Sequence, residues 1–179
     1  MRGGRLTLRA ALLAACAVVL AGCSLQPDVA QRVGSGSGGG VGQAAPALQG
    51  TTLDGAQFDG SVLKGHVAVV DFWASWCGPC RAQQDQLDAM AKTYVPRGVA
   101  FVGVDIRDDS AQGRAYVSRF GLTYPSLDDP SSALAGKWDV AAPPTTVVLA
   151  ADGTVQQRVL GGVDAASLGP LLDRLLSGR

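Results

Sequence analysis

The sequence predicts an α/β fold with a central mixed β-sheet flanked by helices, and three observations support this class. Two apolar runs, residues 67–72 with a single acid and residues 99–104, are typical of buried strands. A segment with helical spacing of apolar residues separates them, and this order indicates a βαβ unit with parallel strands. Further along the chain, Asp152-Gly153 joins two β-rich runs, which is a strong signal for an antiparallel hairpin.

Residues 1–22 have the pattern of an export signal. Three arginines precede an apolar run, residues 10–21, which suits a signal peptide and falls short of the roughly 20 residues that a spanning helix needs. The run ends in Leu20-Ala21-Gly22-Cys23, which resembles the lipobox of bacterial lipoproteins. The resemblance implies that Cys23 is lipidated and anchors the protein to the cell membrane. Ordinary secretion and an uncleaved anchor are alternatives, and all three place the domain outside the cytoplasm.

Residues 23–45 are expected to form a lipidated cysteine and a flexible tether, because residues 34–40 are only Gly and Ser. Residues 46–179 are sufficient for one domain with a single core and no structural disulfide. The formal net charge is zero, and no basic cluster with interleaved aromatic residues occurs. Nucleic acid is therefore not an expected partner.

Turn signals and periodicity give the other elements in chain order. A hairpin over residues 48–58 is expected around Asp54-Gly55. The helix after the first buried strand should extend to about Tyr94, and two more helices are expected over residues 110–120 and 131–138. The acid pairs 108–109 and 128–129 are expected in solvated loops and helix caps.

The C-terminal part is expected to contain a hairpin and one helix. Residues 145–149 and 155–160 are the two arms of the hairpin. The helix carries leucines on one face, and its regular part should start near Ser167 so that Pro170 falls in the first turn.

Two thiols, Cys77 and Cys80, lie where the first buried strand gives way to a helix. Their spacing makes a dithiol/disulfide switch, and Pro79 suits the first turn of the helix. A zinc site needs four ligands, whereas the mature domain offers only these thiols and His66, so no metal is expected. Of the other cysteines, Cys16 lies within the signal and Cys23 at its end.

The segment Phe-Trp-Ala-Ser-Trp-Cys-Gly-Pro-Cys-Arg, residues 72–81, resembles the active-site segment of the thioredoxin superfamily. With the lipobox, the early hairpin and room for two helices between residues 106 and 143, the chain is most similar to TlpA/ResA-type membrane-tethered thiol-disulfide oxidoreductases. The resemblance implies a thioredoxin-like fold with an N-terminal β-hairpin and a helical insertion before the cis-proline strand.

A thiolate attacks disulfides, and a helix N-terminus lowers a cysteine pKa from about 8.5 toward ~7 in such sites. Cys77 is therefore assigned as the nucleophile, and Cys80 as the thiol that resolves the mixed disulfide. The redox-active disulfide needs no other cofactor.

Asp71 is an acid within an apolar strand, so burial should raise its pKa and suit it to accept a proton from Cys80 through water. The resemblance implies this catalytic role, and the alternative is a strand-end acid in solvent. Thioredoxins usually pair this acid with a lysine on the neighbouring strand, where Gly103 stands here.

The resemblance also makes Pro144 the cis-proline that faces the dithiol, with an ordinary Pro-Pro turn as the alternative. The backbone of Pro143 would then pair with an extended client segment. The expected client-contact residues are Trp76, Gly78, Pro79, Pro143 and Thr145. Trp73 and Trp138 are expected in the core.

The expected function is reduction of client disulfides outside the cytoplasm, and the family implies apocytochrome c as a client. Gly78-Pro79 is the dipeptide of reducing thioredoxins. Disulfide formation or isomerisation is the alternative, since it uses the same residues. A copper chaperone would need C-x-x-x-C spacing, and a peroxidase would need a Thr and Arg pattern that is absent here. The expected partners are protein thiols or disulfides and a membrane-embedded thiol electron donor, and the expected state is a monomer.

Overall fold

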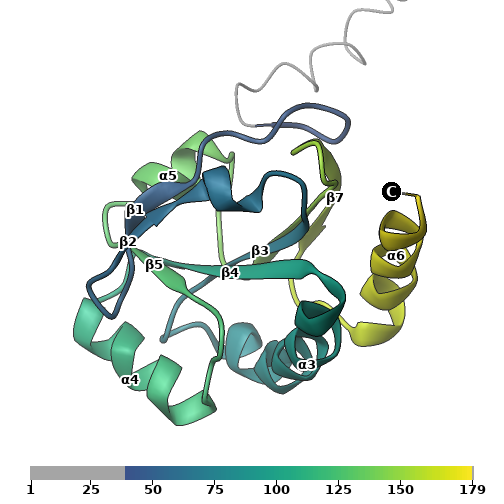
Figure 1. Cartoon of the computed structure of the whole chain (residues 1–179). Coiled ribbons are helices and arrows are strands. Elements are labelled where there is room, and N and C mark those ends of the chain that lie inside the picture. Colours follow the sequence, from purple (N-terminus) through teal and green to yellow (C-terminus); the bar gives the residue numbers. More distant parts are fainter. Residues whose placement is uncertain (1–38, 179) are drawn as a thin grey trace, which may run out of the picture. The chain divides into compact units, whose positions relative to one another are not determined.

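Five strands form a central sheet in the order β5-β4-β3-β6-β7 in the computed structural model, which describes residues 39–178 (Figure 1). β3 pairs in parallel with β4, and β4 with β5, whereas β6 is antiparallel to both β3 and β7. The strand bounds are β3 Val67–Trp73, β4 Val99–Ile106, β5 Ser126–Asp129, β6 Thr145–Leu149 and β7 Val155–Leu160. The thioredoxin-like α/β fold predicted from the sequence is confirmed.

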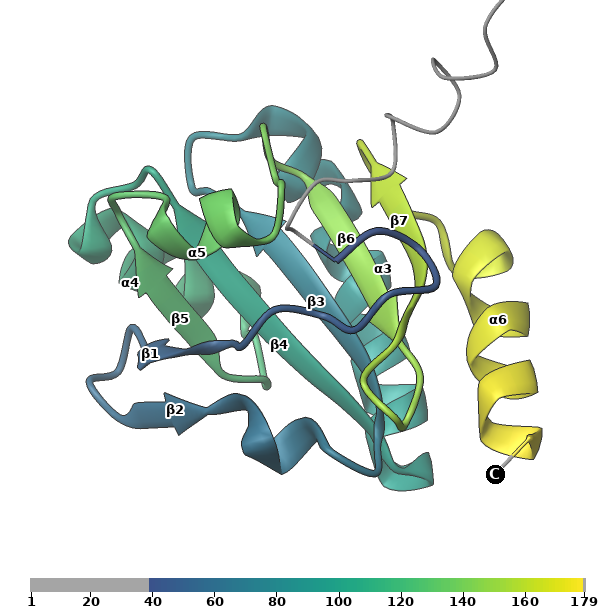
Figure 2. The same ribbon diagram turned by 90° about the horizontal axis from the view of Figure 1, so that it is seen from above.

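Helices cover both faces of this sheet. α3 and α6 lie on one face, and α5 lies on the other together with the separate hairpin β1–β2 (Figures 1 and 2). The bounds of these elements are β1 Gln49–Thr51, β2 Gln57–Asp59, α3 Gly78–Tyr94, α4 Ser110–Phe120, α5 Ala133–Lys137 and α6 Ala165–Ser177, with short 3-10 helices at Gly60–Leu63 and Val95–Arg97. The hairpin, the βαβ unit and the two helices between β4 and β6 occur as predicted.

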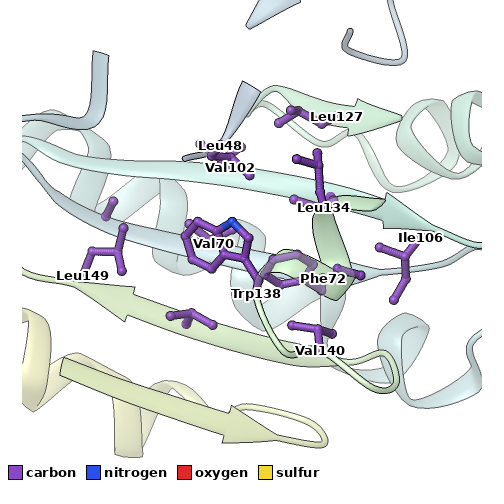
Figure 3. Close-up of a cluster of buried hydrophobic side chains, with 14 of the residues drawn as sticks. Leu48, Val70, Phe72, Val102, Ile106, Leu127, Leu134, Trp138, Val140 and Leu149 are labelled. Carbon is purple, nitrogen blue, oxygen red and sulfur yellow. The ribbon is translucent and has the colours of Figure 1, made fainter. Parts of the chain in front are cut away.

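β3 is buried on both faces, which explains its continuously apolar sequence. Val67 and Val69 pack in the cluster formed with α3 and α6. Val70 and Phe72 point the other way, and Phe72 lies against Trp138 with ring centroids 5.6 Å apart (Figure 3). β3 therefore packs between two hydrophobic clusters, one on each face of the sheet. This packing fixes the position of the loop that follows the carboxyl end of β3.

β5 was not predicted from the sequence. Its residues Ser126–Asp129 include two aspartates, which are poor strand formers, and the segment is a strand because it pairs in parallel with β4. Asp129 is 3 % exposed and accepts a hydrogen bond from the N–H of Ala135 at 2.9 Å. Asp129 is therefore buried and does not lie in a solvated loop, whereas its bond to the first turn of α5 agrees with the expected role in a helix cap. Asp109 likewise caps α4 as expected.

α6 starts two residues earlier than predicted. The side chain of Asp164 accepts from the N–H of Ser167 at 2.7 Å and so caps a helix that begins at Ala165. Pro170 consequently lies in the second turn and not in the first, where it removes one backbone donor from the helix.

The N-terminal part of the domain is longer than predicted. Gly42 donates to the carbonyl of Val155 at 2.8 Å, and Ala45 donates to the carbonyl of Gly153 at 2.9 Å. These residues were expected in the flexible tether, but they pair with β7 and the turn before it, so the ordered chain begins ahead of Pro46. The expected signal peptide, Cys23 and the tether up to residue 38 lie outside the described residues.

Candidate active site

The two cysteines form a disulfide at the N-terminus of α3, directly after the loop that follows β3. The S–S distance is 2.04 Å. Cys77 is the N-cap of α3, and its Sγ accepts a hydrogen bond from the N–H of Cys80 at 3.1 Å. A thiolate on Cys77 in the reduced protein would occupy the same position, where unpaired amides and the helix dipole favour negative charge.

The disulfide is bordered by a small buried cluster. Leu53, Trp73, Ala74 and Tyr116 pack with the two cysteines. The ring of Tyr116 stacks on Trp73 with centroids 4.4 Å apart, and its hydroxyl donates to the carbonyl of Cys80 at 3.2 Å. Neither Leu53, from the N-terminal hairpin, nor Tyr116, from α4, was predicted to support the dithiol.

Asp71 lies inside the sheet and is 2 % exposed. Its carboxylate accepts from Thr146 Oγ1 at 2.8 Å and from Gln83 Nε2 at 3.2 and 3.4 Å. Burial raises the pKa of Asp71 to about 6, while the hydrogen bonds from Thr146 and Gln83 act in the opposite direction. The alternative of a solvent-facing acid is therefore wrong, and Asp71 is suited to exchange a proton near neutral pH.

Gly103 on β4 is in register with Asp71, as the comparison with thioredoxins implies. A Cβ atom at Gly103 would lie 2.6 Å from Trp73 Nε1 and closer still to Ser126 Oγ, so this position has no room for a lysine. The partners of Asp71 are instead the neutral side chains of Gln83 and Thr146. Gln83 was not predicted as a site residue. Its position three residues after Cys80, on the inward face of the helix, is the sequence feature that could have identified it.

The Pro143–Pro144 peptide bond is cis, as the resemblance implies. Thr145 pairs with Phe72 near the carboxyl end of β3, so the proline loop lies at the same end of the sheet as the disulfide. Thr145 itself is 2 % exposed, and its hydroxyl donates to the carbonyl of Ala142 at 2.8 Å. In this arrangement the Thr145 side chain supports the loop and does not lie on the surface expected to contact clients.

Trp76, Gly78 and Pro79 are exposed beside the disulfide, and Pro143 is partly exposed. Trp76 is 53 % exposed, and its indole N–H donates to the carbonyl of Arg107 at 3.0 Å. This bond holds the ring against the loop after β4. The structure thus places four of the five expected contact residues at the accessible end of the site.

The other residues singled out from the sequence lie away from this surface. Trp73 and Trp138 are fully buried, which confirms their assignment to the core. His66 is exposed, and its Nδ1 lies 3.2 Å from the carbonyl oxygen of Gly98.

A second buried acid, Asp105, was missed by the sequence analysis. It is fully buried at the end of β4, in register with Trp73. Burial, and then the neighbouring carboxylates of Asp108 and Asp128, raise the pKa of Asp105 to about 8. Asp108 in turn accepts from the Oγ of Ser75 at 3.0 Å, in the loop that leads to Cys77. Within residues 39–178, no three His, Cys, Asp or Glu side chains are arranged to hold a metal ion.

A redox-active cysteine pair at this strand–helix junction defines a thiol-disulfide oxidoreductase with a thioredoxin-like fold. Comparison with known sequences agrees, because the profile of the AhpC/TSA family matches residues 41–158. The chain belongs to the AhpC/TSA family.

Individual relatives indicate which proteins of this family the chain resembles. The chain is 31 % identical over 141 residues to the thiol:disulfide interchange protein HelX of Rhodobacter capsulatus, which covers 77 % of this chain and 78 % of HelX. It is 26 % identical over 121 residues to the thiol-disulfide oxidoreductase ResA of Bacillus thuringiensis, which covers 68 % of this chain and 70 % of ResA. These relatives support the ResA-type resemblance found in the sequence.

Solved structures give the same result. A thioredoxin-family thiol:disulfide interchange protein of Chlorobium tepidum superposes with a TM-score of 0.69 and 28 % identity, covering 74 % of this chain and 95 % of that one. A secreted disulfide oxidoreductase of Mycobacterium tuberculosis has a TM-score of 0.63 and 33 % identity, covering 73 % and 95 %. In the part of this chain from residue 39 to 178, none of the helices is long and apolar enough to span a bilayer.

Proposed function

We propose that this protein reduces disulfide bonds of client proteins outside the cytoplasm, with Cys77 as the nucleophile. The observation that carries the proposal is the place of Cys77 at the cap of α3, beside the exposed Trp76 and Pro79. A client that approaches this end of the sheet reaches Cys77 before the fully buried Cys80.

The thiol-disulfide exchange proceeds in two steps. The Cys77 thiolate attacks one sulfur of the client disulfide, forms a mixed disulfide and releases the other client sulfur as a thiolate. The Cys80 thiolate then attacks the sulfur of Cys77, which re-forms the Cys77–Cys80 disulfide and releases the second client thiolate. The client gains two electrons and this protein loses two. A thiol donor, proposed to lie in the membrane, returns the protein to the dithiol state.

Asp71 serves in this proposal as the group that accepts the proton of Cys80, through water. A carboxyl whose pKa is about 6 is largely ionised at pH 7 and is still basic enough to take up a proton. Its fixed hydrogen bonds to Thr146 and Gln83 hold the carboxylate on the α3 side of the sheet.

The direction of exchange is tested by the reduction potential of the Cys77/Cys80 couple. The soluble chain, residues 24–179, is equilibrated in glutathione or dithiothreitol buffers and the disulfide fraction is measured. A value at or below roughly −220 mV supports a reductase. A value approaching about −120 mV contradicts the proposal and indicates an oxidase that forms disulfides in exported proteins.

The proposed clients are apocytochromes c, whose haem-binding cysteines must be reduced, as the resemblance to ResA-type proteins implies. The test is thiol trapping. In cells that carry Cys80→Ser, mixed disulfides should accumulate with apocytochrome c, and Cys77→Ser should abolish them. Recovery of other exported proteins alone would contradict this client assignment.

The proposed membrane attachment depends on lipidation of Cys23. The wild-type protein should be labelled by a fatty-acid analogue and sediment with membranes, whereas Cys23→Ala should lose the label. A wild-type protein that carries no label would contradict the anchor without affecting the redox proposal.

A further inference from the structure

Arg107 occupies an unusual position at the end of β4. Its φ angle is 52°, in the left-handed region that residues other than glycine rarely adopt. Such conformations persist where surrounding contacts hold them, and they concentrate at functional sites. The backbone N–H of Arg107 donates to the carbonyl of Asp129 at 3.2 Å, which ties the residue to the end of β5.

Two hydrogen bonds connect Arg107 to both sides of the redox site. Its carbonyl accepts from the indole of Trp76 at 3.0 Å, and its guanidinium Nη2 donates to the carbonyl of Ala141 at 2.9 Å. Trp76 belongs to the loop after β3, and Ala141 to the loop before β6. Because β3 lies between β4 and β6, the Arg107 side chain must extend past the end of β3 to reach Ala141.

This arrangement links the surfaces that would hold a client segment. Trp76 adjoins Cys77, and Ala141 lies two residues before Pro143, whose backbone is proposed to pair with the client. A change in the distance between these loops would misalign an extended polypeptide with Cys77. A small disulfide, which reaches Cys77 without pairing to the loop, would be little affected.

We propose that Arg107 is a positioning residue that sets the spacing between Trp76 and the cis-proline loop and thereby determines the affinity for polypeptide clients. This inference rests on the proposed client surface but not on the direction of exchange, since a client docks in the same place whether it is reduced or oxidised.

Arg107→Gly is the informative variant. Glycine adopts a φ of 52° without a Cβ penalty, so the carbonyl that holds Trp76 is retained and only the guanidinium bridge is lost. The matched control is Arg114→Ala, which removes an exposed arginine from α4. Both are compared with wild type in insulin reduction by dithiothreitol, and in the reaction of the reduced protein with 5,5′-dithiobis(2-nitrobenzoate).

Arg107→Gly should raise the KM for insulin about fivefold, with kcat and the rate with the small disulfide changed by less than about twofold. Arg114→Ala should match wild type in every measurement. The difference in KM should persist in 0.5 M NaCl, because the bridge, unlike charge steering, is not removed by screening. An unchanged KM, an equal loss with both substrates, or a difference that disappears in salt would each overturn the inference.

A wrong direction of exchange can be distinguished from a wrong role for Arg107. If the wild-type protein does not reduce insulin, the same variants are compared in the oxidation of a reduced dithiol peptide. The proposed role then requires the fivefold effect on the KM for that peptide, and its absence overturns the role in this direction also.

Discussion

The side-chain amide of Gln83 donates to both carboxylate oxygens of Asp71, at 3.2 and 3.4 Å. The carbonyl oxygen of the same amide accepts from the backbone N–H of Val163 at 2.9 Å, so the orientation of Gln83 is fixed from both sides. Burial raises the pKa of Asp71 to about 6, and the neutral amide opposes this shift less than the charge of a lysine would. This buried pair is the basis for two predictions.

Asp71→Asn should stabilise the oxidised protein at neutral pH. The folded pKa is about 6 and the ordinary value is 3.8, so the folded state binds more protons than the unfolded state between these values. Stability from this group is fully present below about pH 4 and is lost as the pH rises through 6. Removing the charge should therefore add up to about 3 kcal/mol at pH 7.5 and almost nothing at pH 4. Urea unfolding at both pH values measures the difference, and equal stabilities at pH 7.5 would show that the carboxylate is not penalised.

Gln83→Met should raise the pKa of Asp71 further, because it removes one of the two side chains that stabilise the ionised form. The carboxyl band of Asp71 in infrared spectra of the oxidised protein reports this pKa without interference from thiols. Insulin reduction should show the same upward shift in the midpoint of its pH dependence.

The control for this variant is Gln86→Met. Gln86 lies on the same helix and accepts from the N–H of Ala165 at 3.2 Å, remote from Asp71. It should leave the Asp71 titration unchanged. If Gln83→Met titrates like wild type, Gln83 does not tune this acid.

Most of the fold could be predicted from local sequence patterns. The apolar runs predicted β3 and β4, and the Asp152-Gly153 turn predicted β6 and β7. The bounds of α4 match its predicted range. The dithiol was found because its two cysteines are close in sequence, and Asp71 because it interrupts an apolar run, whereas the role of Pro144 came from the resemblance to the thioredoxin superfamily. Each of these signals depends on short-range order, which a single sequence contains.

The features that were missed depend on contacts distant in sequence. β5 has weak strand propensity and forms because β4 offers a free edge. Thr146 reaches Asp71 across 75 positions, and Arg107 reaches Ala141 across 34. No local pattern specifies such pairs, since they depend on how β3, β4 and β6 are ordered in the sheet.

Serine substitutions of the two cysteines should have different effects on insulin reduction. Cys77→Ser removes the nucleophile and should abolish insulin reduction. Cys80→Ser keeps the nucleophile but removes the resolving thiol, so mixed disulfides with insulin should accumulate on non-reducing gels. Full turnover by either variant would contradict the two-step mechanism, and trapping by Cys77→Ser instead would reverse the two roles.

Gly103→Ala should destabilise the protein by about 1–3 kcal/mol, because a side chain here overpacks the sheet beside Asp71. Its Cβ would lie 2.6 Å from Trp73 Nε1, and Trp73 is held from the other side by its stacking on Tyr116. The control is Gly136→Ala in α5, where a Cβ would meet no atom within 4 Å beyond its chain neighbours and the backbone of its own helix, so alanine should be neutral or stabilising. Urea unfolding of both variants measures the effect. If Gly103→Ala is as stable as Gly136→Ala, this part of the sheet can accept a side chain, and steric exclusion no longer explains why Asp71 is paired with Gln83 and Thr146 in place of a lysine.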